Sequence, residues 1–305
     1  MTNRWMDQLS SRDIAAAHDF ERALRGDRSL VGLQPFGGAL GRSSPEVMED
    51  YGETPIANDD RVQVRSVATR PSTRLFPFNT ICLVRRPPST DLGSGTLIAP
   101  QVVLTAGHVL TGESSVTITP GADMSAGTDA ERRPATPRTQ TVPSSRFRFH
   151  PTLDIALALM PAPFTRPNEF MMLQPRGDAN TATLLSNAGY PGGTTGLPPG
   201  WSSGTMWRHT DQVPIAGVTP TRLFYPIDTS PGHSGSPLWL LGNDGIRLLL
   251  AVHTNGVAGC QPNRNCGVRI TCAVITWIEN ECRAAGVTGP RVDRVAFRRT
   301  CPATP

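Results

Sequence analysis

The sequence predicts an all-β protein, and three observations carry that prediction. The chain of 305 residues contains 29 Gly and 29 Pro, whereas aromatic residues make up only 6%. This composition is typical of a protein rich in turns. From residue 62 onward, short apolar runs of strand character alternate with turn residues. The length allows two core-forming units with extensions at the ends.

The strand-like runs fall into two groups along the chain. The first group consists of residues 80–84, 95–98, 102–104, 115–118 and 155–157. The second group consists of residues 182–188, 203–208, 214–218, 221–227, 236–241, 246–253 and 267–271. Residues 120–145, rich in Pro, Thr, Arg and Gly, are predicted to form a long surface loop. The proline-containing segment 161–181 is predicted to connect the two groups.

A serine between two glycines is the strongest candidate for reactive chemistry. The hexapeptide Gly232–Pro237 (GHSGSP) precedes the apolar run 238–241, so Ser234 is predicted on a tight turn ahead of a strand. Gly232 lets the backbone come close to a substrate carbonyl. The N–H groups of Gly232 and Ser234 can then point at the oxygen that becomes negative during acyl transfer.

Two other segments supply the groups that a serine nucleophile needs. His108 follows the predicted strand 102–104, and Asp154 precedes the predicted strand 155–157. A serine hydroxyl needs a base that titrates near pH 7, which is histidine. The histidine needs a carboxylate that fixes its tautomer and stabilises the imidazolium. Each residue alone has an ordinary structural explanation, but the order His, Asp, Ser in these contexts favours nucleophilic catalysis.

Three motifs resemble the catalytic motifs of chymotrypsin-fold serine proteases. They are Thr105–His108 (TAGH), Asp154–Leu157 (DIAL) and Gly232–Pro237 (GHSGSP). The ending Ser-Gly-Ser-Pro is similar to that of the bacterial glutamyl endopeptidase branch. Further likeness lies in residues 93–98, 188–191, 265–270 and 274–278, and the resemblance covers residues 56–285.

The resemblance implies two antiparallel six-stranded β-barrels of the chymotrypsin type with a C-terminal helix. We expect a partly helical N-terminal extension at 1–55, a first barrel at 56–165 and a second barrel at 166–272. Residues 273–305 are expected to form the helix, at 273–285, and a tail that contains cysteine. The extension, with a predicted helix from Ser11 to Leu24, is interpreted as the propeptide of a zymogen, and a mobile segment without a role is the alternative.

The resemblance also implies a processing site. Residues Asn58–Arg61 resemble the segment just after the mature start of family members, which places that start near Thr54. The bond between Glu53 and Thr54 is therefore the predicted cut. His233 stands where the digestive enzymes of this fold place an aspartate that pairs with a new N-terminus. That ion pair therefore cannot activate this chain.

Residue roles follow from the resemblance. Ser234 attacks the scissile carbonyl, His108 accepts and returns the proton, and Asp154 orients His108. Gly232 and Ser234 form the oxyanion hole. The reaction needs no cofactor and no metal, and the histidines show no spacing typical of a zinc hydrolase.

Two sequence features disagree about the substrate. His253 resembles the family histidine that binds a glutamate side chain, and Thr229 matches the hydroxyl of that pocket, with further pocket residues at Thr254, Asn255 and Gly256. Asp228 stands where relatives that cut after arginine or lysine place their specificity carboxylate. A serine endopeptidase preferring Glu or Asp is the leading interpretation. A trypsin-like endopeptidase, an intracellular regulatory protease and a catalytically silent binding module are the alternatives.

Charge and cysteine content limit which partners the protein can bind and which cellular compartment it can occupy. The formal net charge is +4, and the arginines are scattered, which favours protein or peptide substrates over nucleic acid. No run is long enough to span a membrane, and a monomer is expected. Six cysteines favour an oxidising destination, secreted or in the cell envelope, although the first thirty residues show no signal peptide. Pairings Cys260–Cys266 and Cys282–Cys301 are expected.

Overall fold

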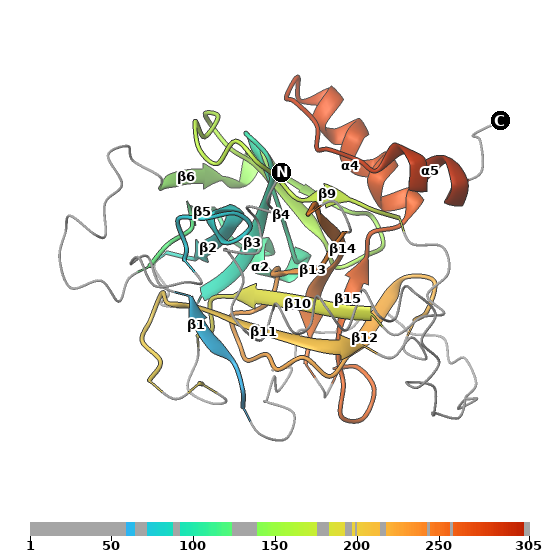
Figure 1. The fold of residues 1–305 in the computed structure, drawn as a ribbon. Coiled ribbons are helices and arrows are strands. Elements are labelled where there is room, and N and C mark those ends of the chain that lie inside the picture. The colour runs from blue at the N-terminus through green and yellow to red at the C-terminus, as the bar shows by residue number, and fades with distance from the viewer. Residues whose placement is uncertain are drawn as a thin grey trace, which may run out of the picture.

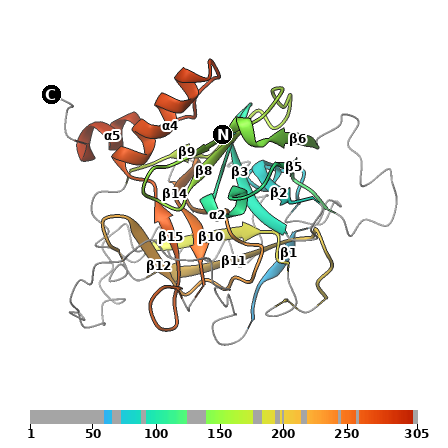
Figure 2. The same ribbon diagram turned by 180° about the vertical axis from the view of Figure 1, so that it is seen from behind.

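A computed structural model describes residues 59–64, 72–87, 92–123, 139–175, 183–192, 197–198, 200–213, 218–242, 245–256 and 259–301. Within these ranges the strands gather into two sheets, and the helices α4 and α5 lie together at one side (Figures 1 and 2). The all-β prediction with a C-terminal helix is confirmed. The predicted extension and the predicted processing bond at Glu53 lie outside the described residues.

The first sheet closes on itself. Its strand order is β6-β5-β2-β3-β4-β8-β7, and all of its pairings are antiparallel. Its two end strands, β6 and β7, are separated in sequence only by the 3-10 turn η4 (Ser144–Arg146). Counted as one bent strand, β6 and β7 give the six strands that were predicted. The bounds are β2 (Ile81–Arg85), β3 (Leu92–Ala99), β4 (Val102–Thr105), β5 (Ser115–Pro120), β6 (Gln140–Pro143), β7 (Phe147–Phe149) and β8 (Ala156–Leu159).

The second sheet contains six strands and two additions. Its order is β1-β11-β10-β13-β14-β15-β12, with β9 pairing in parallel with β14. The strand β1 pairs with β11, so it belongs to this sheet, whereas the sequence analysis assigns residues 56–165 to the first barrel. The bounds are β1 (Val62–Val64), β9 (Met172–Leu173), β10 (Thr183–Gly189), β11 (Met206–Val213), β12 (Arg222–Tyr225), β13 (Pro237–Leu241), β14 (Arg247–Asn255) and β15 (Asn265–Arg269).

Strand β2 explains how the two sheets share a core. All of its residues from Ile81 to Val84 are buried, on both faces. Ile81 and Leu83 pack in a cluster that also contains Trp239 and Val252 of the second sheet, whereas the alternate residues pack in a separate cluster of the first sheet. Because side chains alternate along a strand, one face of β2 fills its own barrel and the other contacts the second sheet.

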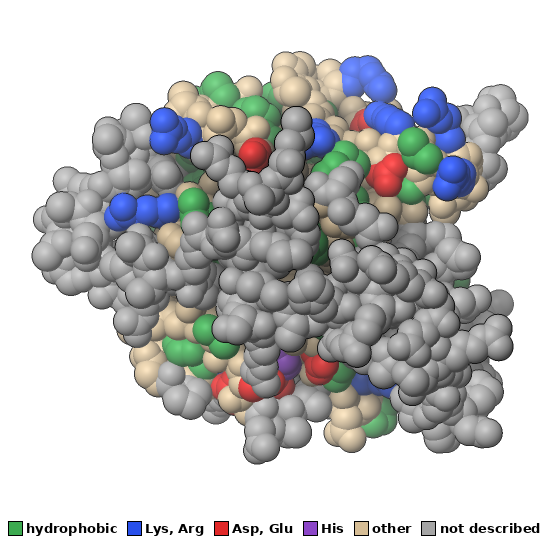
Figure 3. Space-filling view, viewed as in Figure 1, with side chains coloured by type: hydrophobic (Ala, Val, Ile, Leu, Met, Phe, Trp, Pro, Cys, Tyr) green, Lys and Arg blue, Asp and Glu red, His purple; other side chains and the backbone are tan. Residues whose placement is uncertain are grey.

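The C-terminal region contains two helices, of which the sequence predicts one. Helix α4 (Cys272–Ala284) begins at the Thr271 cap, and α5 (Arg294–Thr300) was not predicted. The ion pair between Arg294 and Glu279 joins the two helices. Arginine side chains gather over them (Figure 3). They are Arg283, Arg291, Arg294, Arg298 and Arg299.

The disulfides correct one expected pairing. Cys260 pairs with Cys266, as predicted, with sulfur atoms 2.00 Å apart. Cys301 pairs with Cys272 and not with Cys282. Cys282 is buried on the apolar face of α4 and packs in the core, which keeps it away from the tail. The loop predicted at 120–145 is also wrong in part, because its last residues form β6.

Candidate active site

His108 and Asp154 meet because their strands pair. Thr105 of β4 lies opposite Ala156 of β8, and His108 and Asp154 are just beyond these two residues. The short helix α2 (Gly107–Leu110) carries His108. A side chain at Gly107 would come within 2.9 Å of the Asp154 carboxylate, so only glycine lets this turn approach the aspartate so closely.

Asp154 holds His108 at two points. The His108 backbone N–H donates to Asp154 Oδ1 over 2.8 Å, and the ring nitrogen Nδ1 lies 2.7 Å from Oδ2. Burial raises the pKa of Asp154, but the hydrogen bonds and charge of His108 outweigh burial, so the pKa lies below its usual value. An ionised carboxylate only accepts hydrogen bonds, so Nδ1 carries the proton and Nε2 is the basic nitrogen.

Ser234 lies in a loop that docks on the first sheet through Ser94 of β3. The Ser94 backbone N–H donates to the Ser234 carbonyl over 2.8 Å, and the Ser94 hydroxyl donates to the Gly232 carbonyl over 2.7 Å. The Tyr190 backbone N–H in turn donates to that hydroxyl. Ser94 was not singled out from the sequence, although the flanking glycines of the Gly93–Gly95 segment are a signal for close backbone approach.

Two glycines give the serine loop its shape. Gly232 has φ +97° and Gly235 has φ +88°, which lie in the region that side chains strain. A side chain at Gly235 would overlap the Ser94 carbonyl and the Thr105 hydroxyl, which precedes His108 by three residues. The loop therefore sits against the strands that lead to His108. Ser234 itself is 9% exposed.

His233 is buried and hydrogen-bonded inside the same loop. Its Nδ1 lies 3.1 Å from the Ser230 carbonyl, and the Ser230 backbone N–H lies 3.2 Å from Nδ1. Burial lowers the pKa of His233 most, and the charges of Arg61 and His253 lower it further, so it falls well below the usual value. His233 is therefore neutral at pH 7.

This shift predicts a pH dependence of stability. An unfolded chain binds a proton at His233 below about pH 6.5, whereas the folded chain does not until far lower pH. The contribution of His233 to the free energy of unfolding is fully present above about pH 6.5. Below that pH it falls by about 1.4 kcal/mol per pH unit of acidification. His233→Asn should remove this one-proton slope from the free energy of unfolding, measured by urea titration between about pH 7 and pH 5. Parallel slopes in the two proteins would contradict the assignment.

The residues predicted for the glutamate pocket are all buried. Thr229 and His253 are 0% exposed, Thr254 is 1% and Asn255 is 7% exposed. His253 Nδ1 lies 2.5 Å from the Tyr225 hydroxyl, a contact that sequence reasoning missed because the two residues lie 28 positions apart. The Thr254 hydroxyl donates to Asn255 Oδ1 over 2.8 Å. Gly256 follows directly at the end of β14.

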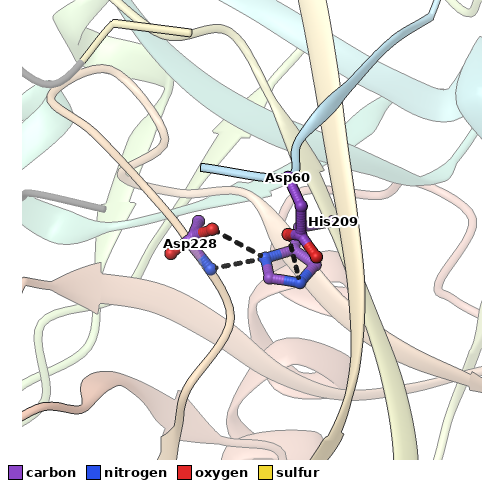
Figure 4. Close-up of side chains that lie close together, drawn as sticks. All are labelled: Asp60, His209 and Asp228. Atoms are coloured by element: carbon purple, nitrogen blue, oxygen red, sulfur yellow. Dashed lines mark hydrogen bonds and ion pairs between the residues drawn. The ribbon is translucent and has the colours of Figure 1, made fainter. Parts of the chain in front are cut away.

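Asp228 lies beside a histidine that the sequence analysis did not single out. The His209 ring of β11 has Nδ1 3.4 Å from the Asp228 carboxylate and Nε2 2.9 Å from the Asp60 carboxylate. The Asp228 backbone N–H also donates to Nδ1 over 2.7 Å. Figure 4 shows the ring between the two aspartates. Both ring nitrogens thus face protein groups, and we interpret the cluster as a hydrogen-bonded network and not as a metal centre.

Known proteins resemble this chain over most of the described region. A family model of the trypsin-like peptidase domain matches residues 93–245. The glutamyl endopeptidase of Bacillus licheniformis is 29% identical over 234 residues, covering 74% of this chain and 68% of that protein. The extracellular metalloprotease of Bacillus subtilis is 27% identical over 238 residues, covering 73% and 68%.

A solved structure has a similar fold. The structure of a Glu endopeptidase in complex with MPD matches with a TM-score of 0.57 and 22% identity, covering 74% of this chain and 97% of that chain. At this level of identity the likeness concerns the fold. It agrees with the expected chymotrypsin-like arrangement of two barrels.

Proposed function

Because the chain belongs to the trypsin-like peptidase family and is a serine endopeptidase, we propose that it cuts peptide bonds after glutamate through Ser234, His108 and Asp154. The observation that carries the proposal is the two-point contact of Asp154 with His108. This contact gives His108 the tautomer that a general base for serine requires. Protein or peptide chains are the substrate class.

The proposed reaction runs through an acyl-enzyme. Ser234 Oγ attacks the scissile carbonyl carbon while its proton passes to His108 Nε2. The backbone N–H groups of Gly232 and Ser234 stabilise the resulting oxyanion, and His108 then protonates the departing amine. Water, deprotonated by His108, attacks the ester carbonyl. The bond between the acyl carbon and Ser234 Oγ then breaks, His108 returns its proton to Ser234 Oγ, and the acid product leaves. Asp154 stays ionised throughout and stabilises the imidazolium.

The glutamate preference rests on buried polar groups. A substrate carboxylate entering a dry pocket needs hydrogen-bond donors, because an unpaired charge there is costly. The Thr229 hydroxyl is buried and has no hydrogen-bond partner in the described part of the chain, so it can donate to a ligand. The Tyr225 hydroxyl lies 2.5 Å from His253 Nδ1. A hydroxyl that donates to Nδ1 leaves the ring proton on Nε2, the nitrogen that we propose donates to the substrate carboxylate.

The trypsin-like alternative depends on Asp228. Its carboxylate lies 3.4 Å from His209 Nδ1, and the Asp228 backbone N–H donates to the same nitrogen, which disfavours its use as a receptor for a substrate guanidinium. The preference for Glu over Arg can be measured by mapping cut sites in a peptide library with the processed protein. Cuts after arginine would favour Asp228, and the absence of any cuts would favour the silent binding module.

Thr229→Val tests the pocket directly. Valine keeps the shape of threonine but cannot donate, and a hydrogen bond to a charged group contributes about 1.5–3 kcal/mol. We expect kcat/KM for a peptide with Glu before the cut to fall about thirtyfold, and less for the matched Gln peptide, whose neutral bond is weaker. Thr96→Val, at a buried threonine of β3 whose hydroxyl also has no hydrogen-bond partner among the described residues, is the matched control. Equal losses on both peptides would contradict the assignment.

We also propose that the protein acts outside the cytoplasm. Two disulfides are present in the described residues, and disulfides persist in oxidising compartments. One relative is named an extracellular protease. No helix among the described segments has the length and apolar character needed to cross a membrane.

A further inference from the structure

The segment just before β1 reaches the loop that carries Ser234. Arg61 is buried, with a side chain 0% exposed, and its Nη1 donates to the Ser230 hydroxyl over 2.7 Å. Asp59 accepts from the other two nitrogens of the guanidinium, Nε over 2.9 Å and Nη2 over 2.7 Å. The guanidinium is thus neutralised on one side and fixed to Ser230 on the other.

The neighbouring residue reaches the same loop by a second route. Asp60 contacts His209 Nε2, and the opposite nitrogen of that ring accepts the Asp228 backbone N–H. Figure 4 shows this bridge from Asp60 through the ring to Asp228. Pairing of β1 with β11, which carries His209, holds both routes in register.

The two routes end on either side of Thr229. Asp228 is held through His209 and Asp60, and Ser230 is held by Arg61. Because the residues before and after Thr229 are both fixed to the same N-terminal segment, the backbone at Thr229 has little freedom to turn. The Thr229 hydroxyl between them is buried and has no hydrogen-bond partner among the described residues.

We propose that Arg61 and Asp60 are positioning residues for the recognition of glutamate, acting through Thr229. We call Asp60, Arg61 and His209 the clamp. The inference rests on the proposed glutamate pocket and adds the device that aims its hydroxyl. Preorganised donors need no rearrangement when a ligand binds, so loosening the clamp weakens the bond that Thr229 makes to a carboxylate.

The test compares matched peptides with Glu or Gln before the cut. Arg61→Ala and Asp60→Ala each remove one of the two contacts with the loop. Arg61→Lys keeps the charge on a single nitrogen that lacks the planar fork of the guanidinium. We expect Arg61→Ala to lower the Glu-to-Gln ratio of kcat/KM about fivefold, mainly through a higher KM, and Arg61→Lys to recover part of it. Val62→Ala, at an exposed position of the adjoining strand, should leave the ratio unchanged.

A double-mutant cycle decides whether the clamp acts through Thr229. In the Thr229→Val background, Arg61→Ala should have little further effect on the Glu-to-Gln ratio of kcat/KM, because the hydroxyl that Arg61 is proposed to position is absent. A full additional loss in that background, or equal losses on both peptides, would overturn the clamp. Should Arg61→Ala fail to fold, Asp60→Ala, at a half-exposed side chain, carries the same cycle.

The cycle separates the clamp from the pocket assignment. A parent enzyme without glutamate preference, or one whose preference survives Thr229→Val, overturns the proposed pocket and the clamp that depends on it. A preference that is lost with Thr229→Val but untouched by Arg61→Ala and Asp60→Ala overturns the clamp alone.

Discussion

Ser234→Ala should lower kcat of the processed protein by about a millionfold while the fold persists. In the proposed mechanism the Ser234 hydroxyl oxygen is the attacking atom, and alanine has no such oxygen. The residual rate reflects binding and the oxyanion hole. The change removes one oxygen from a side chain that is 9% exposed, so the loss of packing is small. Hydrolysis of a glutamyl peptide, followed over days at high enzyme concentration, measures it.

Covalent labelling provides the control for this loss. A serine-directed phosphonate should label the parent protein and leave Ser234→Ala unlabelled, while thermal unfolding of the two proteins coincides. Ser144→Ala, at an exposed position of η4, is the matched serine control and should keep full labelling and activity. Equal labelling of Ser234→Ala would reject the proposed nucleophile.

Asp154→Asn should lower kcat by about ten-thousandfold. The asparagine oxygen can still accept the His108 backbone N–H, so the geometry of the turn is retained. Its amide group, however, presents a donor to Nδ1 and forces the imidazole proton onto Nε2, which then cannot accept from serine. The measurement is kcat against pH at saturating substrate.

A second carboxylate supplies the control for Asp154. Asp293 caps α5 by accepting from two backbone N–H groups, and asparagine caps helices about as well as aspartate. Asp293→Asn should therefore leave kcat near that of the parent. A loss of activity in Asp154→Asn that is matched by Asp293→Asn would show a general effect of charge removal.

Short sequence patterns predicted the strands and turns whose conformation depends on residues close together in the sequence. Buried runs such as 80–84 and 102–104 became β2 and β4 with small shifts in their ends, since a short continuous apolar run suits a strand covered on both faces. The positions of His108 and Asp154 followed from the same runs. The glycines around Ser234 were predicted to be needed, and the positive φ values at 232 and 235 agree.

Contacts between distant segments could not be predicted from the sequence. Arg61 and Ser230 are 169 positions apart, and nothing near either residue indicates the other. The strands β1 and β9 have three and two residues, too short to show a period. The pairing of Cys301 depended on which face of α4 was buried, since spacing alone admits Cys272 and Cys282 equally.

The contacts of Ser94 have a consequence for the protein during its synthesis. One residue of the first barrel bonds two carbonyls of the loop that carries Ser234. A nascent chain that has been synthesised only as far as β10 contains His108 and Asp154 but lacks Ser234, the proposed nucleophile. The second half alone lacks β3, the strand that its serine loop contacts. Cleavage competence therefore arises only when both halves have been synthesised and joined, so unfinished copies of the protein cannot digest one another.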